Sequence, residues 1–360
     1  MHVGTGAFFQ NPGHARSDAE IWRQGLEIAG MAEPLGFDSV WSAEHHFTDC
    51  HMCPNVAQFL TWVASRTQRV KLGSMVMVLP WHDPVRLAEE VSVLDHMSGG
   101  RVLLGLGRGL GRVEFEGFRV EMSESRRRFT EYATAILSAL ETGEMAYDGE
   151  LYRQPPVKIR PAPFASFRGR TYASAISPET SRILAELGVG MMIIAQKPWE
   201  TIEADVADYR ELYREINGEE APKPLLASWV AVHESQAAAE EMCERWIMGY
   251  CASVLEHYEF ANVGLADIPG YEYYGKLAER IAKHGPEAFS RFLADLQCYG
   301  TPATVTEQLR ENVRRIDGAG VIGIFNYAGM PDDVARNNLE LFAHEVMPTL
   351  QSIDTTAALR

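Results

Sequence analysis

The stretch VKLGSMVMVLPWHDPVRLAEEVSVLDHMSGGRVLLGLG, residues 70–107, contains the repeating unit that decides the fold of this chain. It begins with an apolar run at 70–80, continues with apolar residues at helical spacing over 83–100, and ends with a second apolar run at 101–107. A buried strand, an amphipathic helix and another buried strand in this order predict a βαβ unit with parallel strands.

The same unit recurs along the chain. Each predicted strand is followed by a helical pattern, which is clearest at 17–37, where Ser17 or Asp18 is the expected N-cap and Gly36 the expected stop. Eight such units favour a closed (β/α)8 TIM barrel over an open, doubly wound sheet. The other predicted strands are 2–9, 38–43, 170–175, 189–195, 225–232 and 321–327, and the other clear helices are 54–67, opening with Pro54, 123–143 and 331–350.

Two segments lie outside this repeat. Residues 147–163 are predicted to form a β-hairpin, and residues of about 260–300 form an insertion between the seventh helix and the eighth strand. Barrel enzymes have about 250 residues before insertions, so we expect one barrel domain over residues 1–360. Insertions of more than about 15 residues on the catalytic face favour a lid, although the stretch 271–292 could be only a surface embellishment.

Composition excludes several classes of protein. The net charge of −16 opposes binding to nucleic acid or to anionic membranes. No apolar run approaches the ~20 residues that span a bilayer, and the N-terminal residues do not resemble a signal peptide. The five cysteines are an odd number, which indicates reduced thiols. We therefore predict a cytoplasmic protein.

The stretch WSAEHHFTDCHMCPN, residues 41–55, has three possible interpretations: a zinc site, a redox pair or acid–base machinery. Zinc at Cys50, His51 and Cys53 is disfavoured because no second ligand pair exists, and a redox pair belongs at a helix start in another fold. His45 and His46 follow a predicted barrel strand, where an imidazole can transfer protons. Their side chains diverge, so only one faces the barrel mouth, and both could also be ordinary packed or surface histidines.

A phosphate site is indicated after two other strands. GLGRGLG, residues 105–111, combines exposed backbone amides with the guanidinium of Arg108. Ser177 and Thr180 open the following helix, whose N-terminus favours an anion. The alternative is that Ser177 only caps its helix and the glycines only turn the chain. The glycine spacing does not match the Rossmann pattern.

Several motifs together resemble the bacterial luciferase-like, flavin-dependent monooxygenases, and the luciferase α subunit in particular. They are EHHFT (44–48), GSMVMVLPWHDPVRLAEE (73–90), LDHMSGGRVLLGLGRGL (94–110), YGTPATV (299–305) and EVMPTL (345–350). The resemblance extends over nearly the whole chain. It implies a TIM barrel that uses reduced FMN from a separate NAD(P)H:flavin reductase, and O2. A flavin-4a-hydroperoxide then attacks an aldehyde or ketone.

The resemblance also implies roles for individual residues, and no metal site is expected. His45 is the expected catalytic imidazole. Glu44 and the Met75–Val76 peptide are expected along the flavin ring, and this peptide is a non-proline cis bond in relatives. The expected phosphate ligands are Arg108, the amide of Leu110, Ser177 and Thr180.

Four positions differ from luciferase. Gly107 replaces a reactive cysteine, Ala195 and Tyr250 replace cavity tryptophans, and Gly111 replaces a tyrosine. These differences predict a substrate pocket that is reshaped and widened beside the flavin at Gly107, Ala195 and Tyr250. They disfavour light emission and long-chain aldehydes.

Two alternatives share this fold: a flavin- or deazaflavin-dependent dehydrogenase, and a non-catalytic flavin-binding subunit. EHHFT and the long insertion favour the monooxygenase. The resemblance further implies a homodimer through helices 54–67 and 83–97, with a heterodimer left open. The expected interface residues are Ala57, Leu60, Val63, Ala64, Leu87, Val91 and Leu94, although this face could instead pack on the barrel.

Overall fold

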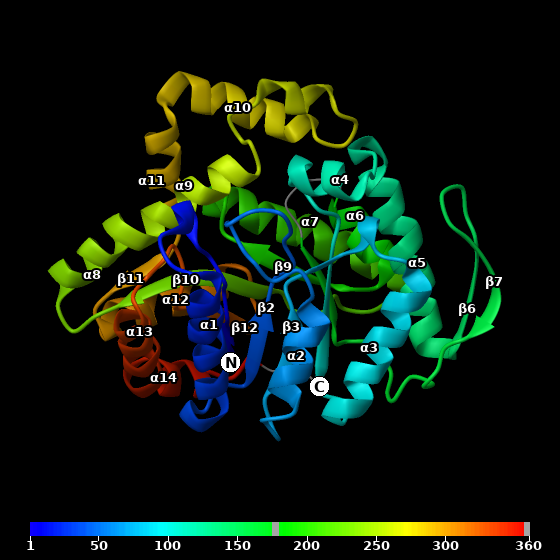
Figure 1. Cartoon of the computed structure of the whole chain (residues 1–360), viewed down its shortest axis with the longest axis horizontal. Helices are drawn as coiled ribbons and strands as arrows, with labels where there is room; N and C mark the ends of the chain where they lie inside the picture. Colours follow the sequence, from blue (N-terminus) through cyan, green and yellow to red (C-terminus); the bar gives the residue numbers. More distant parts are fainter. Residues whose placement is uncertain (175–179, 356–360) are drawn as a thin grey trace.

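A ring of parallel strands surrounded by helices forms the centre of the protein in the computed structural model, which describes residues 1–174 and 180–355 (Figure 1). Each barrel strand pairs in parallel with the next, and the last pairs with the first, so the predicted eight-stranded TIM barrel is confirmed for the described residues. In order around the ring, the strands are β1 (His2–Gly6), β2 (Ser39–Ser42), β3 (Lys71–Ser74), β5 (Val102–Gly107), β8 (Thr171–Ser174), β9 (Gly190–Ile194), β10 (Leu225–Val232) and β12 (Gly320–Ile324).

The outer helices begin and end close to the predicted positions. Ser17 caps α1 in a reciprocal capping box with Glu20, and Gly36 ends it with a φ of 94°. The second helix begins at Val56 after its N-cap Asn55, so the expected start at Pro54 was wrong. The helices that surround the barrel are α1 (Asp18–Leu35), α2 (Val56–Ala64), α3 (Pro84–Ser98), α5 (Ser125–Thr142), α6 (Thr180–Leu187), α7 (Trp199–Asn217), α8 (Gln236–Met242), α9 (Met248–His257), α12 (Pro302–Arg315), α13 (Asp332–Glu345) and α14 (Met347–Gln351).

The predicted strand at 70–80 is interrupted. It consists of β3 and the short β4 (Met77–Val78), and the Met75–Val76 peptide between them is cis, as expected from the resemblance. Gly105 of the neighbouring strand accommodates this break, because a Cβ there would lie 1.8 Å from the carbonyl oxygen of Ser74. The hydroxyl of Ser74 also bonds the backbone of Gly105 at 2.8 and 2.9 Å.

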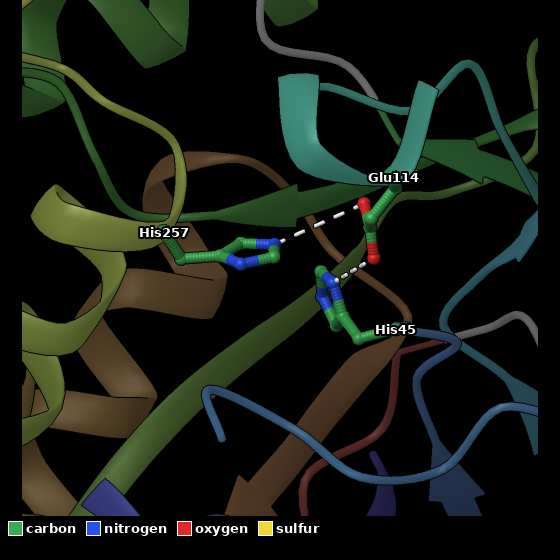
Figure 2. A group of neighbouring side chains, drawn as sticks. All are labelled: His45, Glu114 and His257. Atoms are coloured by element: carbon green, nitrogen blue, oxygen red, sulfur yellow. Dashed lines mark hydrogen bonds and ion pairs between the residues drawn. The ribbon is translucent and has the colours of Figure 1, made fainter. Parts of the chain in front are cut away.

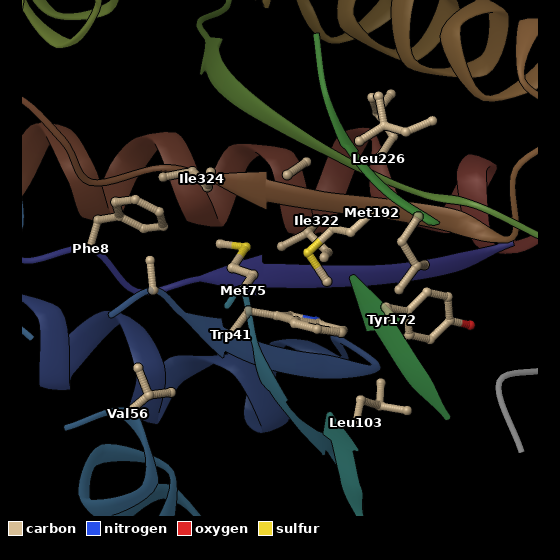
Figure 3. Packing of buried hydrophobic residues seen from close by; sticks show 14 of the residues in the cluster. Phe8, Trp41, Val56, Met75, Leu103, Tyr172, Met192, Leu226, Ile322 and Ile324 are labelled. Atoms are coloured by element: carbon tan, nitrogen blue, oxygen red, sulfur yellow. The ribbon is translucent and has the colours of Figure 1, made fainter. Parts of the chain in front are cut away.

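Large apolar side chains fill the barrel (Figure 3). Trp41 is fully buried there, and its indole Nε1–H donates to the hydroxyl of Ser39 at 2.6 Å. Gly73 makes room for the indole ring, since a Cβ at that position would lie 2.0 Å from a ring carbon. Close packing of this kind makes the barrel a rigid support for the residues at its strand ends.

The predicted hairpin is present beside the barrel, where it starts directly after α5. Its strands are β6 (Glu144–Asp148) and β7 (Arg153–Lys158), which pair antiparallel, so the first strand begins earlier than the predicted position 147. The buried carboxylate of Glu131 accepts backbone N–H groups from residues 150–152 in the turn. The hairpin stands away from the strand ends and does not reach the site described below (Figure 1).

The insertion before the eighth strand crosses the C-terminal end of the barrel (Figure 1). It contains a short 3₁₀ turn (Val263–Asp267), α10 (Glu272–His284) and α11 (Pro286–Asp295). Residues Cys298–Gly300 form β11, which pairs with the end of β10, so the insertion ends before residue 298 and not at 300. We call residues 260–295 the lid segment. Among the described residues, no helix is long and apolar enough to cross a membrane.

The apolar face expected at a dimer interface points inward. Its large side chains are buried against the barrel of their own chain, so the alternative that this face packs on the barrel is the correct one. The exposed apolar side chains of α3 are Val93 and Met97, which are 41% and 57% exposed. The buried residues of the expected interface are Leu60, Val63, Ala64, Leu87, Val91 and Leu94.

Candidate active site

A cavity of about 160 Å³ lies where the barrel strands end and the lid segment begins. Polar groups gather at two of its sides and apolar side chains form the rest of its wall. Most of the predicted site residues line it, namely Glu44, His45, Met75, Val76, Arg108, Leu110, Thr180 and Tyr250. Ser177 lies outside the described residues.

His45 follows β2 and is held at both ring nitrogens. Its Nδ1 lies 3.0 Å from Oε1 of Glu114, and its Nε2 lies 3.3 Å from the hydroxyl of Tyr258. The same carboxylate oxygen accepts the backbone N–H of His46 at 2.9 Å. Because a carboxylate accepts only, the geometry assigns the imidazole proton to Nδ1 and leaves Nε2 as the acceptor at the cavity.

Glu114 lies on α4 (Arg112–Phe118), a helix that the sequence pattern did not reveal. Burial alone would raise the pKa of its carboxyl, but the charges of His45 and His257 and the hydrogen bonds that it accepts outweigh burial and lower it. Nε2 of His257 lies 3.8 Å from Oε2 of Glu114. Burial, followed by the neighbouring His45, lowers the pKa of His257 to about 4, so this imidazole is neutral at pH 7.

The adjacent histidine points the other way, as predicted. Nε2 of His46 lies 3.0 Å from Glu44, whose carboxylate also accepts the backbone N–H of Val78 and the indole N–H of Trp81. Nε2 of His82 also lies 2.8 Å from Oε1 of Glu44. Burial raises the pKa of Glu44, but these hydrogen bonds outweigh burial and lower it to about 2. Glu44 therefore borders the cavity as an ionised anchor for the loop after β4.

Two guanidinium groups form the positive side of the cavity. Arg108 and Arg126 both donate to the carbonyl oxygen of Gly270 in the lid segment, at 2.9 and 3.3 Å. The guanidinium of Arg108 lies 4.3 Å from the centre of the Tyr271 ring. Thr180, the first residue of α6, lines the same cavity. Paired guanidiniums beside a helix start are suited to a phosphate group.

The apolar wall differs from the expected one. The rings of Trp229 and Tyr250 stack with centroids 3.8 Å apart, and Tyr250 lies in the cavity as predicted. Gly107 is not part of the wall, because Val76 fills that space and would lie 2.2 Å from a Cβ at position 107. Ala195 is buried behind the wall, where its carbonyl accepts from Gln297 at 3.2 Å. Gly107 and Ala195 therefore do not border the cavity in this structure, whereas Tyr250 does.

The CxxC pair lies behind the site in a structural setting. Nδ1 of His51 accepts the backbone N–H of Phe9 at 3.0 Å, and its Nε2 lies 2.9 Å from the carbonyl oxygen of Ala43. Both nitrogens are therefore engaged with the backbone. Burial raises the pKa values of Cys50 and Cys53 to about 12, so both thiols stay protonated.

The polar residues that surround His45 and Arg108 were not among the predicted site residues, notably Glu114, Arg126, His257 and Tyr258. The predicted residues come directly after strands, whereas these four come from α4, α5 and the end of α9. The only available signal was the RRR triplet at 126–128.

A larger hollow of about 1,090 Å³ lies at the opposite end of the barrel. It is bordered by residues that precede the strands, such as Gly169, Val189 and Ala319. Active sites of TIM barrels lie at the other end, and no group like the His45–Glu114 pair borders this hollow among the described residues.

Comparisons with known proteins show the family to which the chain is similar and the fold that it shares with solved structures. The family model described as luciferase-like monooxygenase matches residues 1–317. The alkanal monooxygenase alpha chain of Photobacterium leiognathi is 28% identical over 354 residues, which cover 95% of this chain and 97% of that protein. The solved structure of the oxygenating constituent of 3,6-diketocamphane monooxygenase from Pseudomonas putida, in complex with FMN, has a TM-score of 0.74 at 19% identity. The match covers 97% of this chain and 99% of that chain. The structure of an F420-dependent secondary alcohol dehydrogenase has a TM-score of 0.72 at 14% identity, and the match covers 97% of this chain and 98% of that chain.

Proposed function

This chain belongs to the luciferase-like monooxygenase family, and we propose that it uses reduced FMN and O2 to oxidise the carbonyl group of an aldehyde or ketone. One observation carries the proposal: a single cavity at the C-terminal end of the barrel joins a guanidinium pair to a histidine that is paired with a buried carboxylate. The first is suited to the phosphate of a cofactor and the second to proton transfer.

The residues of the cavity fit a phosphorylated ring cofactor. Arg108, Arg126 and Thr180 would hold the phosphate, with the Leu110 amide and Ser177 as further proposed ligands. The apolar side chains of Met75 and Val76 would lie along the ring. When bound, reduced FMN supplies the electrons that activate O2 for transfer of one oxygen atom.

The lid segment has to move when such a cofactor binds. Ligand sites commonly have volumes of about 300–1,000 Å³, and the present cavity is smaller at about 160 Å³. The phosphate and the Gly270 carbonyl are both acceptors for the same two arginines. We therefore place the opening of the cavity at Gly270, with closure afterwards to keep water from the reaction.

His45 is the proposed acid–base residue. Its Nε2 faces the cavity, where the Tyr258 hydroxyl donates to it, while Glu114 fixes the ring through Nδ1–H. When Nε2 takes a proton, the nearby carboxylate of Glu114 stabilises the resulting imidazolium. Groups in this role typically contribute about 10²–10⁴-fold to a rate.

The substrate and partners follow from the remaining surfaces. The stacked rings of Trp229 and Tyr250 favour an apolar carbonyl compound. We propose a separate flavin reductase, because the chain shows no dinucleotide-binding motif. We also retain the proposal of a homodimer, now through exposed residues of α3 such as Val93 and Met97.

The test begins with anaerobic titrations of the full chain with reduced FMN and, separately, with reduced F420. Oxygen-18 gas is then added with a panel of aldehydes and ketones, and the products are analysed by mass spectrometry. We expect the protein to bind reduced FMN in preference to reduced F420 and to place one labelled oxygen atom in a product. The His45→Ala variant should form this product more slowly. Preference for F420 with hydride transfer and no label would identify the dehydrogenase. If both wild type and His45→Ala bind flavin, and the reduced flavin is oxidised at the same rate in both without any oxygenated product, the chain is the non-catalytic subunit.

A further inference from the structure

Three side chains of types that can bind a metal ion converge beside the cavity, two of them in its lining (Figure 2). They are His45 after β2, Glu114 on α4 and His257 at the end of α9, and one ligand atom from each lies within 4.8 Å of the others. Nδ1 of His45 is 3.0 Å from Oε1 of Glu114, and Nε2 of His257 is 3.8 Å from Oε2. Two imidazoles and a carboxylate are a ligand set that holds divalent transition metals in proteins.

His257 gives this cluster an unexplained feature. Its side chain is 1% exposed, and its Nε2 has no hydrogen-bond partner within the described part of the chain. A buried polar atom in this state is energetically unfavourable, so native proteins usually give it a partner. The nitrogen points toward Glu114 at a distance too long for a hydrogen bond (Figure 2). An ion between the two groups would satisfy it.

The other nitrogen of each imidazole has a suitable partner. Nδ1 of His257 lies 3.1 Å from the hydroxyl of Thr48, and Nε2 of His45 lies 3.3 Å from the hydroxyl of Tyr258. Metal-bound histidines almost always donate their second N–H to such an acceptor, which orients the ring. Both rings are therefore supported in the way that metal ligands require.

We propose that His45 Nδ1, a carboxylate oxygen of Glu114 and His257 Nε2 together bind one divalent transition-metal ion of the Zn²⁺ type, with water as the fourth ligand. Metal–ligand distances of about 2.0–2.2 Å place neighbouring ligand atoms of a tetrahedral site about 3.4 Å apart. In the present structure His45 lies 3.0 Å from Oε1 and His257 lies 3.8 Å from Oε2, and one ligand atom from each of the three side chains lies within 4.8 Å of the others. Binding the ion would draw both imidazole nitrogens toward one carboxylate oxygen of Glu114.

An ion can approach from outside the barrel. A surface pocket of about 600 Å³ includes His257 and Thr48 in its lining. Glu256 and Glu259 add negative charge there, partly neutralised by Arg112, which pairs with Glu259. Negatively lined clefts raise the local concentration of cations.

Metal binding has a consequence for catalysis. This consequence rests on the proposed function, whereas the proposal of the metal site is independent of that function. The ion takes the place of the proton between His45 and Glu114, and the imidazole proton moves to Nε2, where Tyr258 accepts it. His45 then has no free nitrogen at the cavity. Zn²⁺ would therefore inhibit oxygenation.

The test uses the full chain without flavin or O2, so its outcome is independent of the proposed function. Metal-free protein is titrated with Co²⁺, whose visible absorption reports its coordination, and bound metal is counted by mass spectrometry before displacement by Zn²⁺. We expect one ion per chain with a tetrahedral spectrum. His257→Asn should weaken binding by at least about 10–100-fold, as for lesser changes around metal sites. His284→Asn, an exposed histidine on α10, should change nothing. Equal Co²⁺ binding by wild type and His257→Asn would overturn the proposal.

A second measurement avoids the variants in case His257→Asn does not fold. Imidazole ¹⁵N resonances of the wild-type protein are followed as Zn²⁺ is added. Shifts of both His45 and His257 at one equivalent support the site. Shifts confined to exposed histidines would contradict it.

Discussion

The imidazole of His45 and the carboxylate of Glu114 lie 3.0 Å apart although 69 residues separate them in sequence. Glu114 is almost fully buried, so its charge acts on His45 with little screening by water. The pair brings the end of β2 and the helix after β5 to one wall of the cavity. We therefore regard Glu114 as the residue that positions the proposed acid–base imidazole.

Glu114→Gln should lower turnover by at least about 10²-fold, because the amide can donate to Nδ1 and so select the wrong tautomer. The measurement is the steady-state rate with reduced FMN, together with the FMN dissociation constant, which should change little. Glu116→Gln is the matched control on the same helix, since its side chain is 67% exposed. Equal turnover in the two variants would remove Glu114 from the mechanism.

Arg126→Ala should weaken binding of reduced FMN by about 10–100-fold, since hydrogen bonds to charged groups contribute about 1.5–3 kcal/mol. Anaerobic calorimetry measures the dissociation constant. Arg127→Ala provides the control, because Arg127 pairs with the exposed Glu150 away from the cavity. The assignment fails if both variants bind FMN alike, or if riboflavin, which lacks the phosphate, is affected as strongly as FMN.

Tyr271→Phe should loosen the closed lid segment. The Tyr271 hydroxyl donates to Ser125 at 2.8 Å and approaches the carbonyl of Gly109 at 3.1 Å, which holds the segment against the loop after β5. Without these bonds, water reaches the cavity more easily, so a larger fraction of consumed O2 should end as hydrogen peroxide. Peroxide per turnover is the readout, with Tyr147→Phe on the distant hairpin as control. Unchanged coupling would show that closure does not depend on this contact.

His257 should make the protein less stable in acid. Its pKa is lowered from 6.5 to about 4 in the folded state, so the unfolded chain binds more protons between these values and stability falls as the pH decreases through this window. From pH 7 to pH 5 the loss from this residue is about 2 kcal/mol. Urea denaturation at both pH values should show a smaller difference for His257→Asn than for wild type. Some difference should remain, because burial also lowers the pKa values of His2 and His51. An identical pH difference in the variant would contradict the assignment.

Asp95→Ala should be strongly destabilising. Asp95 on α3 makes two hydrogen bonds of 2.7 Å with the guanidinium of Arg170, and both side chains are buried. Removing one partner leaves an uncompensated buried charge, which costs about 3–5 kcal/mol. Urea denaturation measures the loss, and Asp148→Ala, whose side chain is 90% exposed beside Arg153, should have little effect.

The sequence was sufficient for the barrel because its signals are local. The runs at 70–80 and 101–107 show the continuous apolar pattern of strands buried on both sides, and Ser17 and Gly36 mark the ends of α1 by capping chemistry. The same locality placed His45 and Arg108 directly after strands. It also indicated that His45 and His46 diverge, since neighbouring side chains in extended backbone point in opposite directions.

Which residues line the cavity was not predictable in this way. Gly107 and Ala195 are smaller than the residues they replace, and a smaller side chain by itself indicates more space. In the fold, Val76 occupies the space beside Gly107, and Trp229 and Tyr250 stack across the wall. Cavity volume depends on what neighbouring elements place there, which no single position records.

By itself, the sequence determined the eight strand–helix units, and it placed the proposed catalytic imidazole and one proposed phosphate-binding arginine directly after strands. Only the tertiary structure decided which groups surround them: Glu114 from α4, Arg126 from α5, and His257 with Tyr258 from the end of α9. The reason is physical. Hydrophobic periodicity and helix capping depend on residues that are close in sequence. The pKa of a side chain depends instead on its burial and on the groups within a few ångströms, which the closed barrel can bring together from any distance along the chain.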